Sequence, residues 1–239
     1  MKIGIITDIH NNIYALNAVL DGFSKIGIEK IICCGDIIGI GSKPDETVKK
    51  LIEIQDILEC VRGNHDNYLI SGMPSRVPNS EMMSYAEMEQ HKWEHSKLSD
   101  ESKNFIKSLP FTKLLSVGDK KIYIAHYSMN SENSYNYGSY KPVPTFDDLT
   151  VMFRNIDADV IVYGHNHRPS VINNENKWFI NCGSLGCPMG ENIARAGILN
   201  IDGDITYEQL SVPYDVNEAV VDIRKAKYPD YENILKFFY

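Results

Sequence analysis

The sequence predicts an α/β fold, on the evidence of two patterns in the 239-residue chain. Short apolar runs recur that stop abruptly at a polar residue able to bind a metal, and continuous runs of this length are typical of strands covered on both faces. Between the first of these runs lie segments whose apolar residues recur at helical spacing. About the first sixty residues therefore predict the order strand–helix–strand–helix–strand, with parallel strands.

Five apolar runs end in this way. They span residues 3–6, 31–34, 57–61, 122–125 and 160–163. The polar residues that follow them are Asp8 and His10, Asp36, Asn64 with His65 and Asp66, His126, and His165 with His167. Because ligands gather outside the carboxyl ends of the strands in open α/β sheets, we expect these side chains to meet at one site.

The connecting segments carry helix and turn signals. The first helix follows residues 11–12, two asparagines of which either could cap it. The second helix begins near Ser42, its expected cap, with Pro44 in the first turn. The second half of the chain favours β-hairpins, because the turn pairs at 118–119 and 202–203 each separate two strand-like runs.

The length predicts a single domain over 1–239 that carries an insertion. The polar segment at about 67–112 is expected to be a helical insertion near the site, since it is too short for a core of its own. Ser99 is the expected cap of its last helix. The carboxyl-terminal segment, with helical spacing from Val216 to Ile223, is expected to pack on the core or on a second subunit, which leaves a homo-oligomer open.

The composition argues against several classes of protein. The 24 basic and 32 acidic residues give a net charge of −8, so no basic face for a nucleic-acid polymer is expected. The amino-terminal apolar run meets Asp8 too early for a signal peptide, and no run approaches the ~18–20 residues of a membrane span. The five cysteines fit reduced thiols in the cytoplasm, and the spacing of Cys182 and Cys187 does not favour a metal role.

Histidine is rare but concentrated at the strand ends, which hold five of the seven histidines. Buried imidazoles and carboxylates there cost free energy unless they are paired or bound to a metal. A mixed nitrogen and oxygen set suits Mn²⁺, Fe, Zn²⁺ or Co²⁺ better than Ca²⁺. The candidate ligands are Asp8, His10, Asp36, Asn64, His126, His165 and His167. This set is too large for one tetrahedral ion and suits two ions that share a bridging carboxylate.

The ordered motifs resemble those of the calcineurin-like metallophosphoesterase superfamily. They are D-x-H at 8–10, G-D at 35–36, G-N-H-D at 63–66, His126 and G-H-N-H at 164–167. The segment N-C-G-S at 181–184 resembles a further element of the small bacterial and archaeal phosphodiesterase branch. The resemblance implies a four-layer αββα sandwich of two mixed β-sheets flanked by helices. The chain departs from the family pattern at Ala125, where Gly is usual, and at Cys182, where Pro is usual.

The resemblance also assigns the ligands to two divalent ions. One ion would be held by Asp8, His10, Asp36 and His167. The other would be held by Asp36, Asn64, His126 and His165, with Asp36 as the bridge. Mn²⁺ is the foremost metal, and Fe, Zn, Co and Ni are the alternatives.

The expected function is hydrolysis of a small phosphorylated substrate, either a phosphodiester or a nucleotide phosphoanhydride. The resemblance suggests dinucleoside polyphosphates among the latter. Two divalent ions can hold a bridging hydroxide for in-line attack on phosphorus. His65 is not needed as a ligand and is the predicted general acid. Asp66 is expected to orient its ring and favour the imidazolium, with a surface Asp in a turn as the alternative.

Asn12 and Tyr137 are the candidate substrate contacts. Tyr137 belongs to a tyrosine-rich loop after His126 that could stack on a nucleobase, although a tyrosine-anchored surface loop is favoured. The H-x-x-E-H pattern from His91 to His95 matches some zinc proteases. A solvated helix face is favoured for it, and an overhang that touches substrate is the alternative.

Two other functions stay open. A phosphomonoesterase, including a protein phosphatase, is less favoured because the segment 35–41 lacks the G-D-x-x-D-R-G form with its phosphate-clamping Arg. The same segment lacks the Gly-Lys-Ser/Thr of a P-loop. A protein-interaction scaffold of the same fold, as in the retromer coat, is less favoured because every ligand position is present.

Overall fold

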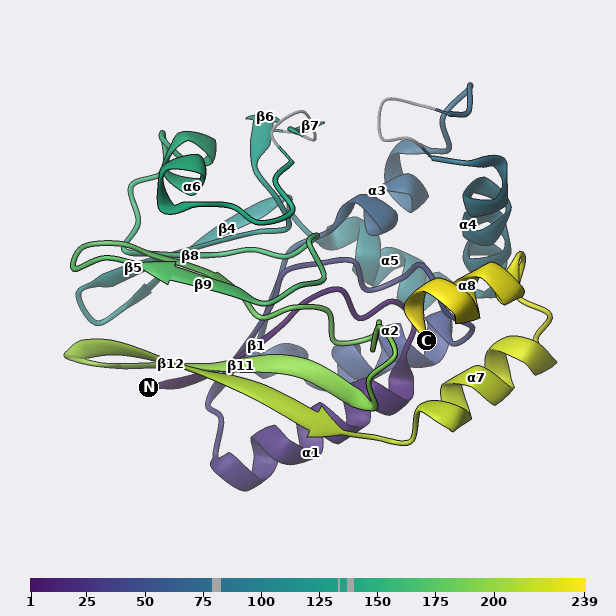
Figure 1. Cartoon of the computed structure of the whole chain (residues 1–239), viewed down its shortest axis with the longest axis horizontal. Coiled ribbons are helices and arrows are strands. Elements are labelled where there is room, and N and C mark those ends of the chain that lie inside the picture. Colours follow the sequence, from purple (N-terminus) through teal and green to yellow (C-terminus); the bar gives the residue numbers. More distant parts are fainter. Residues whose placement is uncertain (79–82, 133, 137–139) are drawn as a thin grey trace.

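Two five-stranded mixed sheets pack face to face, with helices on both outer faces (Figure 1). The computed structural model describes residues 1–78, 83–132, 134–136 and 140–239. This arrangement confirms the predicted sandwich of two mixed sheets flanked by helices. Within the described part of the chain, no helix is both long and apolar enough to cross a membrane.

The first sheet has the strand order β12-β11-β1-β2-β3. Its strands are β1 (Lys2–Ile6), β2 (Lys30–Cys33), β3 (Leu58–Cys60), β11 (Ile193–Asp202) and β12 (Asp204–Pro213). The first three strands run parallel, as predicted, and β11 pairs antiparallel with both β1 and β12. All three parallel strands therefore end at the same edge, where their loops carry the predicted ligands.

The helices α1 (Ile13–Ile26) and α2 (Pro44–Glu53) follow β1 and β2. Asn12 caps α1, since its side chain accepts a hydrogen bond from the Ala15 amide at 3.1 Å. The cap position of α2 is Lys43 and makes no side-chain hydrogen bond, so the predicted cap at Ser42 is wrong. Pro44 does lie in the first turn, where its missing N–H costs nothing.

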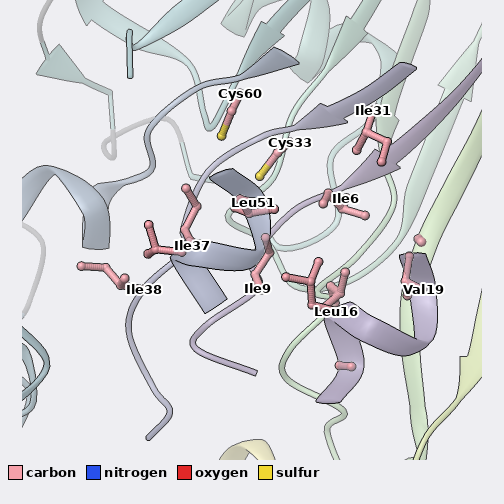
Figure 2. Close-up of a cluster of buried hydrophobic side chains, with 14 of the residues drawn as sticks. Ile6, Ile9, Leu16, Val19, Ile31, Cys33, Ile37, Ile38, Leu51 and Cys60 are labelled. Carbon is pink, nitrogen blue, oxygen red and sulfur yellow. The ribbon is translucent and has the colours of Figure 1, made fainter. Parts of the chain in front are cut away.

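Buried aliphatic side chains fasten these two helices to the outer face of the first sheet. Figure 2 shows Ile6 and Ile31 from the strands close to Leu16 and Val19 of α1 and to Leu51 of α2. All five side chains are at most 2% exposed. At about 1.5–3 kcal/mol for each large apolar side chain, this layer is a main source of stability.

The second sheet has the order β4-β5-β8-β10-β9. Its strands are β4 (Thr112–Val117), β5 (Lys120–Ala125), β8 (Val160–Val162), β9 (Ser170–Asn173) and β10 (Trp178–Asn181). Both predicted hairpins form, through β4–β5 and β11–β12. The outer face is covered by α6 (Phe146–Met152), whose Leu149 packs near Phe179. A two-stranded ribbon, β6 (Met129–Ser131) and β7 (Ser134–Tyr135), follows β5.

A second apolar layer fills the space between the sheets. Ile3 and Ile5 of β1 face Ile122 and Ile124 of β5 in one buried cluster. Alternate side chains of a strand point to opposite faces, so the adjacent cysteines after Ile32 separate: one joins the helix-facing cluster and the other this layer. The sheets are thereby held in register, and their strand ends form one continuous edge.

The remaining α-helices gather beside that edge (Figure 1). They are α3 (Asn64–Ser71), α4 (Tyr85–Lys97), α5 (Asp100–Ser108), α7 (Val216–Lys225) and α8 (Tyr231–Phe238). The short 3-10 helix η1 (Gln55–Ile57) directly precedes β3 and lies at the amino end of that strand. The helices α4 and α5 occupy the segment predicted as a helical insertion. The carbonyl of Phe238 accepts a hydrogen bond from the Met189 amide at 3.0 Å, so the carboxyl-terminal segment packs on its own chain.

A carboxylate joins α2 to the amino terminus of α5. Ser99 caps α5 as predicted, and Asp45 accepts hydrogen bonds from the Ser99 amide at 2.8 Å and the Ser102 hydroxyl at 2.6 Å. Burial tends to raise the pKa of Asp45, but hydrogen bonds from Lys49, Ser102 and Ser99 hold that pKa below its usual range. A depressed folded-state pKa contributes stability above the unfolded-state pKa of about 4, and this contribution is lost as pH falls towards the folded-state value.

Replacing Asp45 by Ala is therefore expected to lower the free energy of unfolding at pH 7 by about 1–3 kcal/mol. Urea denaturation at pH 7 and pH 3 measures the effect, which should shrink at the lower pH. The exposed Asp21 of α1 provides the control, and its replacement by Ala should change stability by no more than about 0.5 kcal/mol. A loss for Asp45→Ala that did not depend on pH would contradict the charge-based account.

Candidate metal centre

The seven predicted ligands lie together at the carboxyl ends of the strands, and strained backbone holds most of them. Five have a positive φ: Asp8 (52°), His10 (48°), Asp36 (51°), His165 (72°) and His167 (53°). This left-handed conformation costs a residue with a side chain about 1–2 kcal/mol. Such strain persists where the surrounding structure enforces it, and it concentrates at functional sites.

Four side chains form the first group. The Nε2 atoms of His10 and His167 lie 3.0 Å apart. Oδ1 of Asp8 lies 3.8 Å from Nε2 of His10 and 3.4 Å from Nε2 of His167. Oδ2 of Asp36 completes the group, 4.0 Å from Nε2 of His10. These are the residues expected to hold the first ion.

The second group shares Asp36 with the first. Oδ2 of Asp36 lies 3.2 Å from Nε2 of His126. Oδ1 of Asn64 lies 3.0 Å from Nε2 of His126 and 3.1 Å from Nδ1 of His165. The Cys34 carbonyl accepts a hydrogen bond from Nδ1 of His126 at 2.8 Å, which fixes that ring with Nε2 towards the site. One carboxylate oxygen of Asp36 therefore faces both groups.

Burial and close packing perturb every titratable group of the centre. Burial and the neighbouring His167 lower the pKa of His10 to about 4, and burial and His126 lower that of His165 to about 4. Burial also tends to lower the pKa of His126, but the charge of Asp36 raises it to about 9. Conversely, burial opposes ionisation of Asp36, yet its histidine neighbours hold its pKa well below the usual range. Carboxylates therefore stay ionised here. His10 and His165 resist protonation, whereas His126 and His167, whose pKa values are raised, hold a proton readily.

This chemistry fits divalent cations. The facing nitrogens of His10 and His167 are 3.0 Å apart. Unless one of them carries a proton, their lone pairs point at each other, which is unfavourable without a cation between them. The other nitrogen of His10, Nδ1, is buried and has no hydrogen-bond partner among the described residues. Imidazole nitrogens facing ionised carboxylates are the donor set that Mn²⁺, Fe²⁺ or Zn²⁺ would accept, and a bound cation would displace the protons of His126 and His167.

The loop after β10 holds the ligand loops in place. Asn181 donates a hydrogen bond to the Gly164 carbonyl at 3.0 Å. Ser184 donates its hydroxyl to the Asp8 carbonyl at 2.8 Å and its amide to the His167 carbonyl at 3.0 Å. The N-C-G-S segment therefore supports two ligand positions, Asp8 and His167, and the residue before His165, although Cys182 replaces the usual Pro.

His65 lies beside the centre, with its Nε2 3.9 Å from Oδ2 of Asp36 and its side chain 13% exposed. Asp66 has a different role from the predicted one. Its buried carboxylate accepts hydrogen bonds from the amides of Gly63 at 2.8 Å, Ile37 at 3.0 Å and Ile38 at 3.1 Å, so it fixes two ligand loops. Burial and the charge of Asp36 raise the pKa of Asp66 to about 6, whereas burial holds that of His65 well below 6.5. The structure thus supports neither the expected imidazolium nor the alternative of a surface Asp66.

Of the two candidate substrate contacts, Asn12 and Tyr137, the structure describes only Asn12. Asn12 is 1% exposed, and besides capping α1 it donates to the Gly186 carbonyl at 2.9 Å and to the Tyr214 hydroxyl at 3.0 Å. These bonds occupy its amide, so the structure gives the predicted substrate contact no support. Tyr137 lies outside the described residues.

Two of the tyrosines near the centre are buried, and one cysteine lies close to it. Tyr127 and Tyr135 are at most 5% exposed and belong to the core under α6, as side chains that anchor a loop would. Tyr140 is 46% exposed, and its ring lies 5.8 Å from that of His165. Cys187, which we did not expect near a metal, offers its sulfur within 4.8 Å of a nitrogen of His10 and of His167.

A cavity of about 430 Å³ adjoins the centre and is lined by His65 and His167. Its walls come from α4 and α8, helices that carry none of the seven ligands. The helix α4 contributes Glu87 and Gln90, and α8 contributes Ile234, Phe237 and Phe238. No sequence pattern indicated that α8 would reach this site, because its apolar spacing is that of any packed helix.

The prediction that the H-x-x-E-H pattern lies on a solvated helix face is wrong. His91 and Glu94 are 1% and 0% exposed, and the ring of His91 lies 4.9 Å from that of His65. Glu87, His91 and Glu94 share one face of α4 through their spacing of three and four residues. That spacing was visible in the sequence, but a charged helical stripe is ordinarily a solvent-facing one.

Comparisons with known proteins agree with this geometry. The model of the calcineurin-like phosphoesterase superfamily domain matches residues 1–204. The protein MJ0912 of Methanocaldococcus jannaschii is 30% identical over 96% of this chain and 94% of its own length. The phosphodiesterase YfcE of Escherichia coli is 22% identical over 84% of this chain and 89% of its own.

Solved structures show the same fold. A metallophosphoesterase from Sphaerobacter thermophilus is 25% identical, with a TM-score of 0.71 over 98% of this chain and 97% of its own. The protein PH1004 from Pyrococcus horikoshii OT3 has a TM-score of 0.84 over 100% of this chain and 97% of its own, at 18% identity. The predicted family and enzyme class, a hydrolase of phosphoesters, are confirmed: the chain belongs to the calcineurin-like phosphoesterase superfamily.

Proposed function

We propose that the chain is a phosphodiesterase that uses two divalent metal ions. The observation that carries the proposal is the position of Asp36, whose Oδ2 lies 4.0 Å from His10 in one ligand group and 3.2 Å from His126 in the other. A carboxylate so placed can bridge two cations. Asp8, His10 and His167 would complete the set for one ion, and the remaining ligands are Asn64, His126 and His165. Mn²⁺ is the metal we propose.

When bound, such a pair supplies Lewis-acid charge to the phosphoryl oxygens and brings the pKa of water towards neutrality. The chain's own contribution is to fix the ligands beforehand. The Cys34 carbonyl orients His126, and the Thr7 hydroxyl donates to Oδ2 of Asp8 at 2.8 Å. Pre-oriented ligands need little rearrangement during the reaction, which is the basis of electrostatic catalysis.

We assign the protonation of the leaving oxygen to His65. It lines the cavity, lies next to the centre and is needed by neither ligand group. Burial keeps the ring neutral, but the negative charge of a bound phosphoester would raise its pKa again. His65 would then carry a proton at Nε2 when the substrate is in place and give it to the departing alkoxide.

The cavity favours a phosphodiester over a nucleotide phosphoanhydride. Its described lining includes the carboxylates Glu87 and Asp230 and the rings of Phe237 and Phe238, and it includes no Lys or Arg. An alcohol leaving group is neutral once protonated and fits such walls. A nucleotide leaving group bears several negative charges that these carboxylates would repel. Dinucleoside polyphosphates are therefore the less favoured substrates.

The state of the cysteines indicates the cellular compartment in which the protein would act. All five are free and buried, which agrees with a reducing environment. We therefore propose that the enzyme acts on a small phosphorylated molecule in the cytoplasm.

Metal removal tests the function. A chelated and dialysed sample should hydrolyse bis(p-nitrophenyl) phosphate at no more than about one-hundredth of the rate regained with Mn²⁺, since the metal supplies several kcal/mol of transition-state stabilisation. Under Mn²⁺, this diester should react faster than p-nitrophenyl phosphate or diadenosine tetraphosphate. Faster hydrolysis of the monoester would indicate a phosphomonoesterase instead. Activity that survived complete metal removal would overturn the proposal.

A further inference from the structure

Beside the centre lies a second cluster of polar groups, of which the proposed reaction uses only His65. One ring nitrogen of His65, one of His91 and a carboxylate oxygen of Glu87 all lie within 4.8 Å of one another. Both ring nitrogens of His91 and Nδ1 of His65 are buried without a hydrogen-bond partner among the described residues. Buried polar atoms are nearly always satisfied, so such a concentration calls for a missing partner.

We propose that His65, Glu87 and His91 bind a third divalent cation, separate from the pair bridged by Asp36. Nε2 of His91 lies 3.9 Å from Oε1 of Glu87, which is too long for a hydrogen bond. The same gap separates donors in the two ligand groups, where the pairs with Asp8 and Asp36 span 3.2 to 4.0 Å. The cluster therefore has the spacing of the other candidate sites.

The surroundings of His91 are those of a metal-binding histidine. Its Nδ1 faces Oε2 of the fully buried Glu94 at 3.5 Å, while Nε2 faces Glu87. Glu94 in turn accepts a hydrogen bond from the Tyr228 hydroxyl. A carboxylate behind the ring commonly orients a metal-binding imidazole and raises its basicity. Tyr228 and Glu94 thus act as positioning residues for this site.

The ligand chemistry suits Zn²⁺. Two imidazoles and one glutamate are a set that zinc uses in open sites, where water fills the remaining position. Water can reach the cluster, because His65 and Glu87 both line the 430 Å³ cavity. A His65 ring bound to an ion through one nitrogen cannot take up a second proton, so an ion at this site would compete with the proton-donating form of His65.

Counting ions tests the inference without an activity assay. Metal-free protein is saturated with Zn²⁺, gel-filtered and analysed by mass spectrometry for zinc per chain. Wild type should retain three ions and His91→Gln two. The control His95→Gln, one helical turn further along α4, should retain three. Glu94→Gln should keep the site but weaken its affinity about 10–100-fold.

Anomalous diffraction at the zinc edge locates the ions. The third peak should lie between His65, Glu87 and His91 and vanish in His91→Gln, while the two peaks around Asp36 remain and show that the variant is folded. Two ions in both wild type and His91→Gln would overturn the inference and leave the proposed function standing. That result would mean that a protonated His91 lies between two carboxylates. Fewer than two ions in wild type would contradict the proposed function itself.

Discussion

Replacing Asp36 by Asn is expected to cost the protein two metal ions per chain and to reduce turnover about a thousandfold. The reason is that Oδ2 of Asp36 faces His10 and His126 at once, so the amide would remove the only described carboxylate shared by the two ligand groups. A thousandfold loss corresponds to about 4 kcal/mol of transition-state stabilisation, a reasonable share for a metal pair. Mn²⁺ content by mass spectrometry and hydrolysis of bis(p-nitrophenyl) phosphate measure the two effects.

Asp148→Asn is the matched control for this change, because Asp148 lies in the first turn of α6, on the outer face of the second sheet, and forms a capping box with Thr145. It should retain wild-type metal content and turnover. If Asp36→Asn lost one ion and kept the other, Asp36 would belong to a single ligand group and the shared-carboxylate arrangement would be wrong.

His65→Gln is expected to lower turnover by about 10²–10⁴-fold while two ions per chain remain bound. The effect should depend on the leaving group. A proton donor matters most when the departing oxygen is strongly basic, so a diester that releases an aliphatic alcohol should lose more activity than one that releases p-nitrophenol. Rates for both substrates, measured side by side with metal content, separate the roles.

Two outcomes would contradict this assignment. Loss of the metal pair in His65→Gln would make His65 a ligand of that pair. An equal loss on both substrates would leave it as a positioning residue only. Asn67→Gln, two residues further along α3, is the control and should leave both rates unchanged.

Much of the centre could be predicted from the sequence because parallel strands impose it. A strand buried on both faces is a short apolar run, and its carboxyl end is marked by the first polar residue. This pattern placed three residues, Asp8, Asp36 and His126, at the carboxyl ends of strands, and the structure brings their side chains together. The paired sheets, in contrast, were implied only by resemblance, since no local pattern says which strands share a sheet.

For three residues the surroundings in the structure differ from the sequence-based expectation, and the physical reason is the same. Asn12, Asp66 and Glu94 are polar and buried, and their roles depend on partners distant in the chain. Asn12 bonds to Gly186, and Glu94 to Tyr228. Sequence spacing does not reveal such contacts. A polar residue near a motif is therefore easily assigned a function that it does not have, and a buried polar residue is easily predicted to face solvent.

The position of α8 has a consequence for how the enzyme could diversify. This helix supplies Ile234, Phe237 and Phe238 to the cavity, carries none of the seven proposed ligands, and lies outside the 1–204 region that the family model matches. Part of the cavity wall is therefore encoded apart from the proposed metal ligands. Grafting or randomising the last helix could retarget the hydrolase to new alcohols while its inorganic chemistry stayed intact.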